Sequence, residues 1–239
     1  MKKCNTCYLQ QFKPRLYFHR KETIQPITWD NYIKNSKFIT EDRISFDKKP
    51  ELINSENINQ IPFYGKVVHN NFFTDLIYIF IYPINPGYKI CGQKVGYHTA
   101  DIEHIIIRIN NITERIVKVF FSSHSKEHQI WDAKDLLLDK NGCVKVFVSL
   151  KSHANYRKPK TYIRILGLAN DITEDKGIQW HAYKVIDIET IKPKQYFKSI
   201  GMKSNNQYCV NGLFNRNFTF NNFHKINSFK RFFYPCFYF

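Results

Sequence analysis

The sequence lacks any long apolar run. Its longest continuous apolar stretch covers residues 76–82, which is the length of a strand, whereas a membrane helix needs about 18 to 20 apolar residues. The amino terminus is basic, but the apolar segment of a signal peptide does not follow it. We therefore expect an intracellular protein, either cytoplasmic or peripherally attached to a membrane, with no transmembrane segment.

Cysteine is scarce, with six residues in 239, which is too few for a disulfide scaffold of this length. Cys4 and Cys7 form a single Cys-x-x-Cys pair. Zinc needs four ligands, and the chain has no second pair at a matching spacing. We expect free thiols near the amino terminus rather than a metal or redox site.

Acidic residues are outnumbered, because 20 Asp and Glu face 36 Lys and Arg, for a formal charge of +16. Eight of the basic residues, and none of the acidic ones, fall within residues 190–239. Such a balance favours an acidic partner: an anionic membrane surface, an acidic protein or nucleic acid. A solubilising surface and the amino-acid bias of an AT-rich genome would produce the same charge.

Long helical patterns are also missing, whereas short strand patterns are frequent. A brief helix is expected around Trp29, and a loop with a short helix over residues 129–138. Turn residues punctuate the rest, as in Asn110-Asn111 and Asn141-Gly142. The expected strands cover residues 63–68, 75–82, 101–109, 116–123, 144–150, 162–166 and 181–186. This pattern predicts an all-β fold, an antiparallel β-sandwich with short peripheral helices.

Three segments are expected along the chain. Residues 1–11 have the composition of an N-terminal tail, residues 12–190 would form the β-sandwich domain, and residues 191–239 form a basic, Asn- and aromatic-rich C-terminal extension. The last eight residues, 232–239, are almost wholly aromatic and would promote aggregation if they were exposed. We expect them to pack on their own domain, on a protein partner or on a membrane surface.

The segment with most chemical information lies where the strand over residues 101–109 begins. Residues two apart share a face of a strand, so Asp101 and Glu103 point the same way as the core-facing Ile105. Two carboxylates there are costly unless they are paired. His98 is expected on the loop before this strand, folding back over them, while His104 faces the other way. The sequence thus predicts a metal site of His98, Asp101 and Glu103, for calcium or magnesium rather than zinc.

Two further histidines, His124 and His153, each follow a serine at the end of an expected strand. If these strands are neighbours, both would meet His98 at one end of a sheet. Ser-His pairs beside an acid suggest His124 and His153 as candidate residues of a hydrolase, although the Gly-x-Ser-x-Gly motif is missing. The alternative is that all of these side chains are hydrogen-bonded structural residues.

Three blocks occur in order along the chain: Gly96-Tyr97-His98-Thr99-Ala100-Asp101-Ile102-Glu103-His104, Phe121-Ser122-Ser123-His124-Ser125 and Val148-Ser149-Leu150-Lys151-Ser152-His153-Ala154-Asn155-Tyr156. Together they resemble the vacuolar protein sorting-associated protein 62 family over about residues 12–190. Here Ala100 and Ile102 replace the Gly and Trp of the family signature Gly-x-His-x-Gly-Asp-Trp-Glu-His. The resemblance implies a site at these residues but no defined reaction.

The first block also has a more distant likeness to the necrosis-inducing cytolysins and their Gly-His-Arg-His-Asp-Trp-Glu heptad. This likeness implies a divalent cation held by His98, Asp101 and Glu103 on a β-sandwich that engages lipid headgroups. That family's upstream acidic ligand has no counterpart, because Cys91 and Gln93 stand nearby instead.

Our preferred hypothesis is a non-enzymatic binding protein for anionic lipid or glycan headgroups in membrane trafficking or membrane association. His98, Asp101 and Glu103 would contact the ligand, and His124 and His153 would flank it. Two alternatives stay open. One is a metal-dependent or His-based hydrolase, and the other is a structural or assembly protein of a large DNA virus or a protist.

Overall fold

A computed structural model describes residues 4–34, 36–40, 43–46, 57–124 and 126–190. The predicted C-terminal extension, residues 191–239, lies outside the described residues, as do the side chains of residues 98–100. No helix within the described ranges combines the length and the apolar character that crossing a membrane requires.

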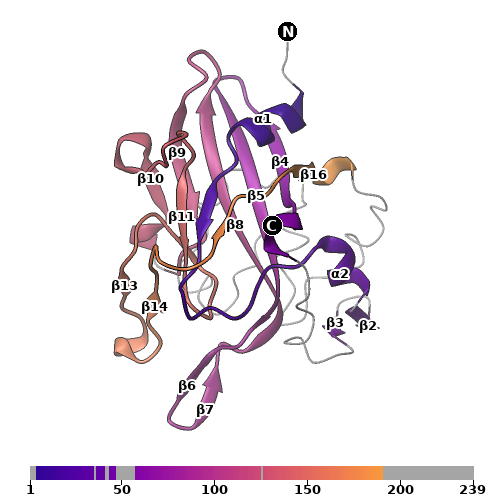
Figure 1. The fold of residues 1–239 in the computed structure, drawn as a ribbon, viewed down its shortest axis with the longest axis vertical. Coiled ribbons are helices and arrows are strands. Elements are labelled where there is room, and N and C mark those ends of the chain that lie inside the picture. Colours follow the sequence, from indigo (N-terminus) through magenta and orange to yellow (C-terminus); the bar gives the residue numbers. More distant parts are fainter. Residues whose placement is uncertain (1–3, 35, 41–42, 47–56, 125, 191–239) are drawn as a thin grey trace.

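The described chain forms an all-β sandwich (Figure 1). One sheet has six strands in the order β10-β9-β8-β5-β4-β16, and the other has four in the order β12-β11-β1-β15. The six are Ile130–Asp132 (β10), Ile116–Phe121 (β9), His98–Asn110 (β8), Phe73–Asn85 (β5), Phe63–His69 (β4) and Val185–Asp187 (β16). The four are Asn155–Tyr156 (β12), Lys145–Val148 (β11), Arg15–Tyr17 (β1) and Gln179–Trp180 (β15).

Small elements surround the sandwich. Three hairpins pair β2 with β3, β6 with β7, and β13 with β14. Their bounds are Ser36–Thr40 (β2), Arg43–Phe46 (β3), Tyr88–Ile90 (β6), Gln93–Val95 (β7), Thr161–Tyr162 (β13) and Asp171–Ile172 (β14). The helices are Asn5–Gln11 (α1) and Trp29–Lys34 (α2), with 3₁₀ turns at Ile58–Gln60 (η2), Lys126–His128 (η3), Ala133–Asp135 (η4), Ile165–Gly167 (η5) and Ile188–Thr190 (η6).

The core lies between the two sheets, and period-two alternation builds it. β5 contributes its even-numbered residues and β8 its odd-numbered residues, because these strands pair antiparallel with Tyr82 opposite Asp101. Trp180 of the four-stranded sheet is 1% exposed. Its ring packs edge-on against Phe63, with ring centroids 4.5 Å apart, and its indole N–H donates to the Ile61 carbonyl. The sheets are thus held together by aromatic packing across the core.

The sandwich prediction is confirmed, with two corrections to its detail. Two pairings are parallel rather than antiparallel, those of β1 with β11 and of β16 with β4. β5 also continues beyond Pro83, which was expected to end it. Pro83 is tolerated because β4 pairs with β5 only as far as Ile79, so the later part of β5 has no β4 neighbour that needs its N–H.

Two short elements also differ from expectation. The strand predicted over residues 162–166 ends at Tyr162, and the chain turns into η5. The predicted N-terminal tail contains α1, because Leu9 is apolar enough to enter the core, where it is fully buried. The predicted helix around Trp29 is present as α2.

The prediction of free thiols for Cys4 and Cys7 is wrong, because the two residues form a disulfide. Cys4 caps the start of α1. Residues three apart at a helix start lie on the same side, and their Cα atoms are 5.2 Å apart, which is within disulfide reach. Within the described residues, Cys91 and Cys143 are free.

Candidate functional site

The backbone of His98 lies in β8, opposite Asn85 of β5. The prediction that His98 stands on a loop before the strand is therefore wrong. β5 and β8 stay paired past Pro83, so the strand begins three residues earlier than expected. The side chain of His98 lies outside the described residues, and its part in the predicted metal set stays a prediction.

Asp101 is paired with His153. The Nδ1 atom of His153 donates to Oδ2 of Asp101 at 2.7 Å, and both residues are buried. The imidazole also lies flat against the ring of Tyr82, with centroids 4.0 Å apart and planes within 4°. Asp101 stands on the six-stranded sheet, whereas His153 follows β11 of the other sheet. The pair therefore joins the two layers at one end of the sandwich.

A second carboxylate, Glu22, approaches the other nitrogen of the same imidazole. Glu22 Oε2 lies 3.9 Å from Nε2 of His153 and accepts the backbone N–H of Lys151 at 2.7 Å. Its Oε1 accepts the N–H groups of Thr23 and Ile24, each at 2.9 Å. Glu22 thus ties the segment after β1 to the turn after β11, and it completes a row of carboxylate, imidazole and carboxylate.

Glu103 lies beside Asp101 on the same face of β8, as predicted. It accepts the hydroxyl proton of Ser122, and that hydroxyl accepts a hydrogen bond from the Asn155 side chain at 2.9 Å. Burial, followed by the charge of Asp101, raises the pKa of Glu103 well above its ordinary value. Two neighbouring carboxylates in one buried place thus disfavour the charged form of Glu103.

Replacing Glu103 with glutamine is expected to stabilise the protein at pH 8 by on the order of 1 kcal/mol. The amide oxygen can still accept the Ser122 proton, and the charge is removed. Because the folded-state pKa lies above the unfolded one, the stability of the protonated wild type is fully present below about pH 4.3 and is lost as the pH rises through the folded-state pKa. Urea unfolding at pH 5 and pH 8 should show the gain growing with pH.

Glu127→Gln is the matched control for this change. Glu127 is exposed, so its substitution should change the free energy of unfolding by less than about 0.5 kcal/mol at either pH. A Glu103→Gln protein that is less stable than wild type at pH 8 would contradict the assignment of Glu103 as a destabilising charge.

Asp171 of β14 is the centre of an adjacent hydrogen-bond network and is fully buried. Burial by itself raises its pKa, but His124 and Arg164 more than offset this effect, and the pKa of Asp171 falls below its ordinary value. Its carboxylate accepts bonds from Tyr88 Oη (2.9 Å), His124 Nδ1 (2.8 Å), Ser152 Oγ (2.6 Å), Tyr156 Oη (2.6 Å) and Arg164 Nη1 (3.1 Å). Five donors from separate segments thus converge on one charge.

His124 and His153 therefore lie at the same end of the sandwich, but in a different way from the prediction. β9 and β11, the strands that precede them, belong to opposite sheets, so the two histidines approach across the core rather than along one sheet. His153 binds Asp101, and Ser152 and His124 bind Asp171. His104 faces the other way, as predicted. It packs against Phe120, and burial lowers its pKa to about 3.

Asp171 and Glu22 were not predicted from the sequence. Neither belongs to a periodic pattern, and the bonds that join them to other segments, Glu22 with Lys151 and Asp171 with His124, span long stretches of the chain.

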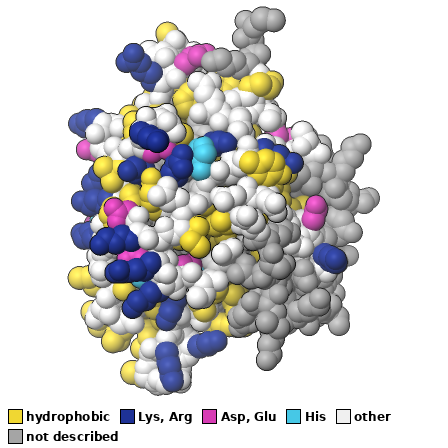
Figure 2. All heavy atoms as spheres, in the orientation of Figure 1, with side chains coloured by type: hydrophobic (Ala, Val, Ile, Leu, Met, Phe, Trp, Pro, Cys, Tyr) yellow, Lys and Arg dark blue, Asp and Glu magenta, His cyan; other side chains and the backbone are white. Residues whose placement is uncertain are grey.

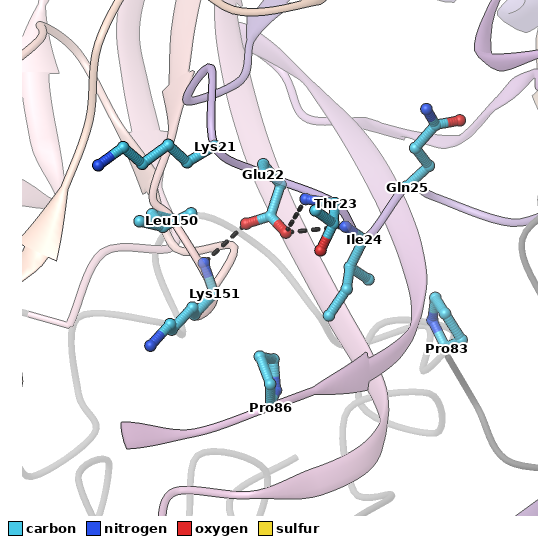
Figure 3. A pocket seen from close by; sticks show the side chains of 9 residues that line it. All are labelled: Lys21, Glu22, Thr23, Ile24, Gln25, Pro83, Pro86, Leu150 and Lys151. Carbon is cyan, nitrogen blue, oxygen red and sulfur yellow. Dashed lines mark hydrogen bonds between the residues drawn. The ribbon is translucent and has the colours of Figure 1, made fainter. Parts of the chain in front are cut away.

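A cleft of about 610 Å³ opens beside Glu22. Figure 3 shows the Glu22 carboxylate at its centre, bonded to Thr23, Ile24 and Lys151. Two exposed lysines stand at one side, and proline rings and aliphatic side chains supply apolar wall. The residues that line it are Lys21, Glu22, Thr23, Ile24, Gln25, Pro83, Pro86, Leu150 and Lys151.

The hydroxyls of Ser122 and Ser152 are held by carboxylates rather than by imidazoles. Ser122 donates to Glu103 and Ser152 donates to Asp171, so neither proton is directed to a histidine base. Among the side chains that the structure describes, no three of His, Cys, Asp and Glu gather as a metal site. The geometry is that of a hydrogen-bonded floor of polar side chains beneath an open cleft.

Comparison with known proteins adds a family match. Residues 47–194 match a family model described as vacuolar protein sorting-associated protein 62. No curated protein matches the chain.

Similar solved structures include three proteins of low identity. NLPPya in complex with mannosamine is 14% identical, with a TM-score of 0.48 and coverage of 82% of this chain and 79% of that chain. Necrosis and Ethylene inducing Protein 2 from the causal agent of cocoa's Witches Broom disease is 14% identical, with a TM-score of 0.49 and 89% of each chain covered. The non-toxic HaNLP3 protein is 12% identical, with a TM-score of 0.48 and coverage of 83% and 81%. At these identities, the residue roles of those proteins do not transfer to this chain.

Proposed function

The chain belongs to the vacuolar protein sorting-associated protein 62 family, and we propose that it is a non-enzymatic binding protein whose cleft beside Glu22 holds an anionic, hydroxyl-bearing headgroup. The observation that carries the proposal is the buried row of Glu22, His153 and Asp101 behind the cleft. Within the row, Glu22 also accepts the backbone N–H of Lys151 and so links the two walls, which forms the cleft before any ligand arrives.

The lining of the cleft supports this class of ligand. Lys21 and Lys151 are exposed and place positive charge at one side, which suits a phosphate or carboxylate group. Pro86, Ile24 and Leu150 are half-buried and supply apolar surface on which the carbon face of a sugar or inositol can lie. The amide of Gln25 can bond to a hydroxyl. A few polar groups around an apolar wall are typical of small-molecule sites.

The fixed floor reduces the entropic cost of binding. The three hydrogen bonds that Glu22 accepts come from backbone N–H groups on both walls, and its side chain is only 5% exposed. Walls fixed in this way lose little freedom when a ligand binds, which leaves more of the contact energy for affinity.

Calorimetric titration of glucuronic acid and of inositol 1-phosphate into the protein tests the proposal. Both probes should bind with a Kd on the order of 1 mM or tighter, and neutral glucose should bind more weakly. Replacing Lys21 and Lys151 together with glutamate should weaken the anionic probes at least tenfold, which corresponds to about 1.4 kcal/mol, because attraction becomes repulsion.

Lys140→Glu is the matched control. Lys140 is also exposed but lies in the turn before β11, at the opposite end of the strand from Lys151. Its substitution should leave the Kd within about twofold of wild type. Equal binding of glucose and glucuronic acid, or anionic binding unchanged in the double lysine variant, would remove the cleft as the headgroup site.

The divalent cation remains a separate part of the proposal. Burial, followed by the charge of Asp101, raises the pKa of Glu103, and calcium or magnesium beside these two carboxylates would offset both effects. His98 is the expected third ligand of the cation. Titration with calcium, magnesium and zinc chlorides, repeated on Glu103→Gln, tests this part. Absence of binding would exclude the cation while leaving the cleft proposal intact, since the probe titrations require no metal.

A further inference from the structure

The segment between β13 and β14 exposes an unusual amount of apolar surface. We call residues 163–168, Ile163-Arg164-Ile165-Leu166-Gly167-Leu168, the apolar loop. Leu166 is 98% exposed, Ile163 79% and Leu168 58%. Single exposed apolar residues are common on protein surfaces, but adjacent ones of this kind usually mark a contact with a partner or a membrane.

The apolar loop reverses the usual distribution of polarity, because its one charged residue points toward the protein interior while its aliphatic residues are exposed. The guanidinium of Arg164 binds the buried Asp171 at 3.1 Å, and its side chain is only 15% exposed. The backbone N–H of Arg164 donates to the Asn170 side chain, and Gly167 N–H donates to the Arg164 carbonyl. The loop is therefore anchored at its base by polar bonds, and it keeps its aliphatic side chains outside.

The backbone holds this arrangement at some cost. Ile165 has φ of 44° and Leu166 has φ of 54°, a region that bulky and β-branched residues rarely adopt. Such strained residues tend to persist where a function requires them. A loop selected for stability alone would carry glycine or asparagine at these positions.

Two exposed lysines, Lys158 and Lys160, lie just before the strand that leads into the apolar loop. Residues 157–170 contain four basic residues and no acidic residue. Arg164 is used internally, while Lys158 and Lys160 are exposed. Figure 2 shows Lys and Arg side chains gathered along the left edge of the molecule, with hydrophobic side chains at the lower left, on the side where Figure 1 places β13 and β14.

We propose that the apolar loop inserts into an anionic lipid surface. Aliphatic side chains at the tip would enter the boundary between headgroups and acyl chains, and the lysines at the base would contact anionic headgroups. A lipid surface fits better than a protein partner, because the tip has no Trp, Tyr or exposed Arg, the residues that dominate protein–protein hot spots, whereas Leu is under-represented there.

The position of the apolar loop relative to the cleft agrees with this role, although the proposal does not depend on the cleft. Leu150, which lines the cleft, donates its N–H to the carbonyl of Ile172 in β14 at 3.0 Å. β14, the strand that follows the apolar loop, is therefore hydrogen-bonded directly to the cleft wall. Insertion of the loop would bring this end of the sandwich to the headgroup layer.

Co-sedimentation with vesicles of phosphatidylcholine and phosphatidylserine at a 3:1 ratio tests the proposal. The combined variant Ile163→Ser, Leu166→Ser and Leu168→Ser should lower the partition coefficient at least tenfold. Ile112→Ser is the matched control, because Ile112 is 85% exposed in the turn after β8, at the far end of that strand from Asp101. It should partition like wild type. All of these side chains are solvent-exposed, so thermal melts should coincide.

A second readout reports insertion itself. The Leu166→Trp protein should show a blue-shifted emission component, quenched by brominated lipid, when these vesicles are added. A triple variant that partitions like wild type would overturn the proposal, and so would a Leu166→Trp protein that shows neither fluorescence change. A triple variant that loses a protein partner but still binds vesicles would equally overturn it, in favour of a protein-binding loop. The soluble-probe titrations of the cleft contain no lipid, so either proposal can fail while the other stands.

Discussion

Replacing Asp171 with alanine is expected to lower the free energy of unfolding by roughly 3–5 kcal/mol, the usual effect of removing one member of a buried charge pair. The carboxylate is fully buried and accepts bonds from five side chains. Without it, the Tyr156 and Ser152 hydroxyls lose a buried acceptor, and Arg164, at 15% side-chain exposure, keeps a charge with no counter-ion at this position. Equilibrium unfolding in urea at pH 7 measures the loss.

The stabilisation by Asp171 should depend on pH in a defined direction. The folded-state pKa of Asp171 is lowered, so its contribution is fully present above the unfolded value of about 3.9 and is lost as the pH falls through the folded-state pKa. The difference in stability between wild type and Asp171→Ala should therefore stay constant from pH 7 to about pH 5 and shrink below about pH 4.

Two variants control this experiment. Asp171→Asn keeps the shape and one acceptor oxygen but removes the charge, so its loss should be smaller than that of alanine. That loss should also shrink below about pH 4, because the pH dependence comes from the wild-type carboxylate in both comparisons. Asp132→Ala removes an acid that is 52% exposed and should change stability by less than about 0.5 kcal/mol. If Asp171→Ala lost no more than Asp132→Ala, the network would be a surface feature without energetic weight.

The face of β8 could be predicted from the sequence because it depends on local geometry alone. Period-two alternation places Asp101 and Glu103 with Ile105 whatever the rest of the fold does. In the structure Asp101 and Ile105 are buried and Glu103 is half-buried. The turn residues after β8 and before β11 act within a few positions of each other. Local signals of this kind can be recognised in a single sequence.

The partners of those carboxylates could not be predicted because they come from distant segments. Glu22 follows β1, yet it reaches a histidine more than 100 residues later. Asp171 binds His124 across 47 positions. These contacts depend on how the two sheets stack, and stacking is a property of the whole core rather than of a short pattern.

Two failed strand boundaries have physical reasons. Pro83 normally ends a strand, but the missing neighbour beyond Ile79 removes the penalty, and β8 begins earlier as a result. Residues 162–166 have the composition of a strand, yet Ile163 is 79% exposed and no described strand pairs with it. Strand propensity without a partner strand does not make a sheet, and here the apolar residues are left at the surface.

His153→Ala is the second change with a large expected effect, a loss of roughly 3 kcal/mol. It removes the donor to Asp101 and leaves that buried carboxylate without this hydrogen bond. It also removes the stacking of the imidazole on the Tyr82 ring, in which the two ring centroids lie 4.0 Å apart. This interaction is worth about 1 kcal/mol. In the binding assay, the same variant should weaken inositol 1-phosphate, because Glu22 loses the imidazole behind it.

His153→Asn separates the contribution of the hydrogen bond to Asp101 from that of the stacking on Tyr82. His153 has φ of 54°, a conformation that asparagine tolerates better than most residues, and the amide can donate to Asp101. This variant should recover at least half of the loss and keep most of the probe affinity. The loss in His153→Ala would have two sources: the missing hydrogen-bond donor and the poorer fit of alanine to the left-handed backbone at this position.

The double-mutant cycle of Asp101→Ala with His153→Ala measures the pair directly. Because each partner is buried and the 2.7 Å bond joins the two sheets, the coupling energy should be about 2 kcal/mol, well above the roughly 0.5 kcal/mol seen for independent sites. Additive losses would mean that each residue acts through other contacts, and the cleft floor would then be two separate structural anchors. Strong coupling would instead establish one unit that spans both layers, which is the rigidity that the proposed binding site requires.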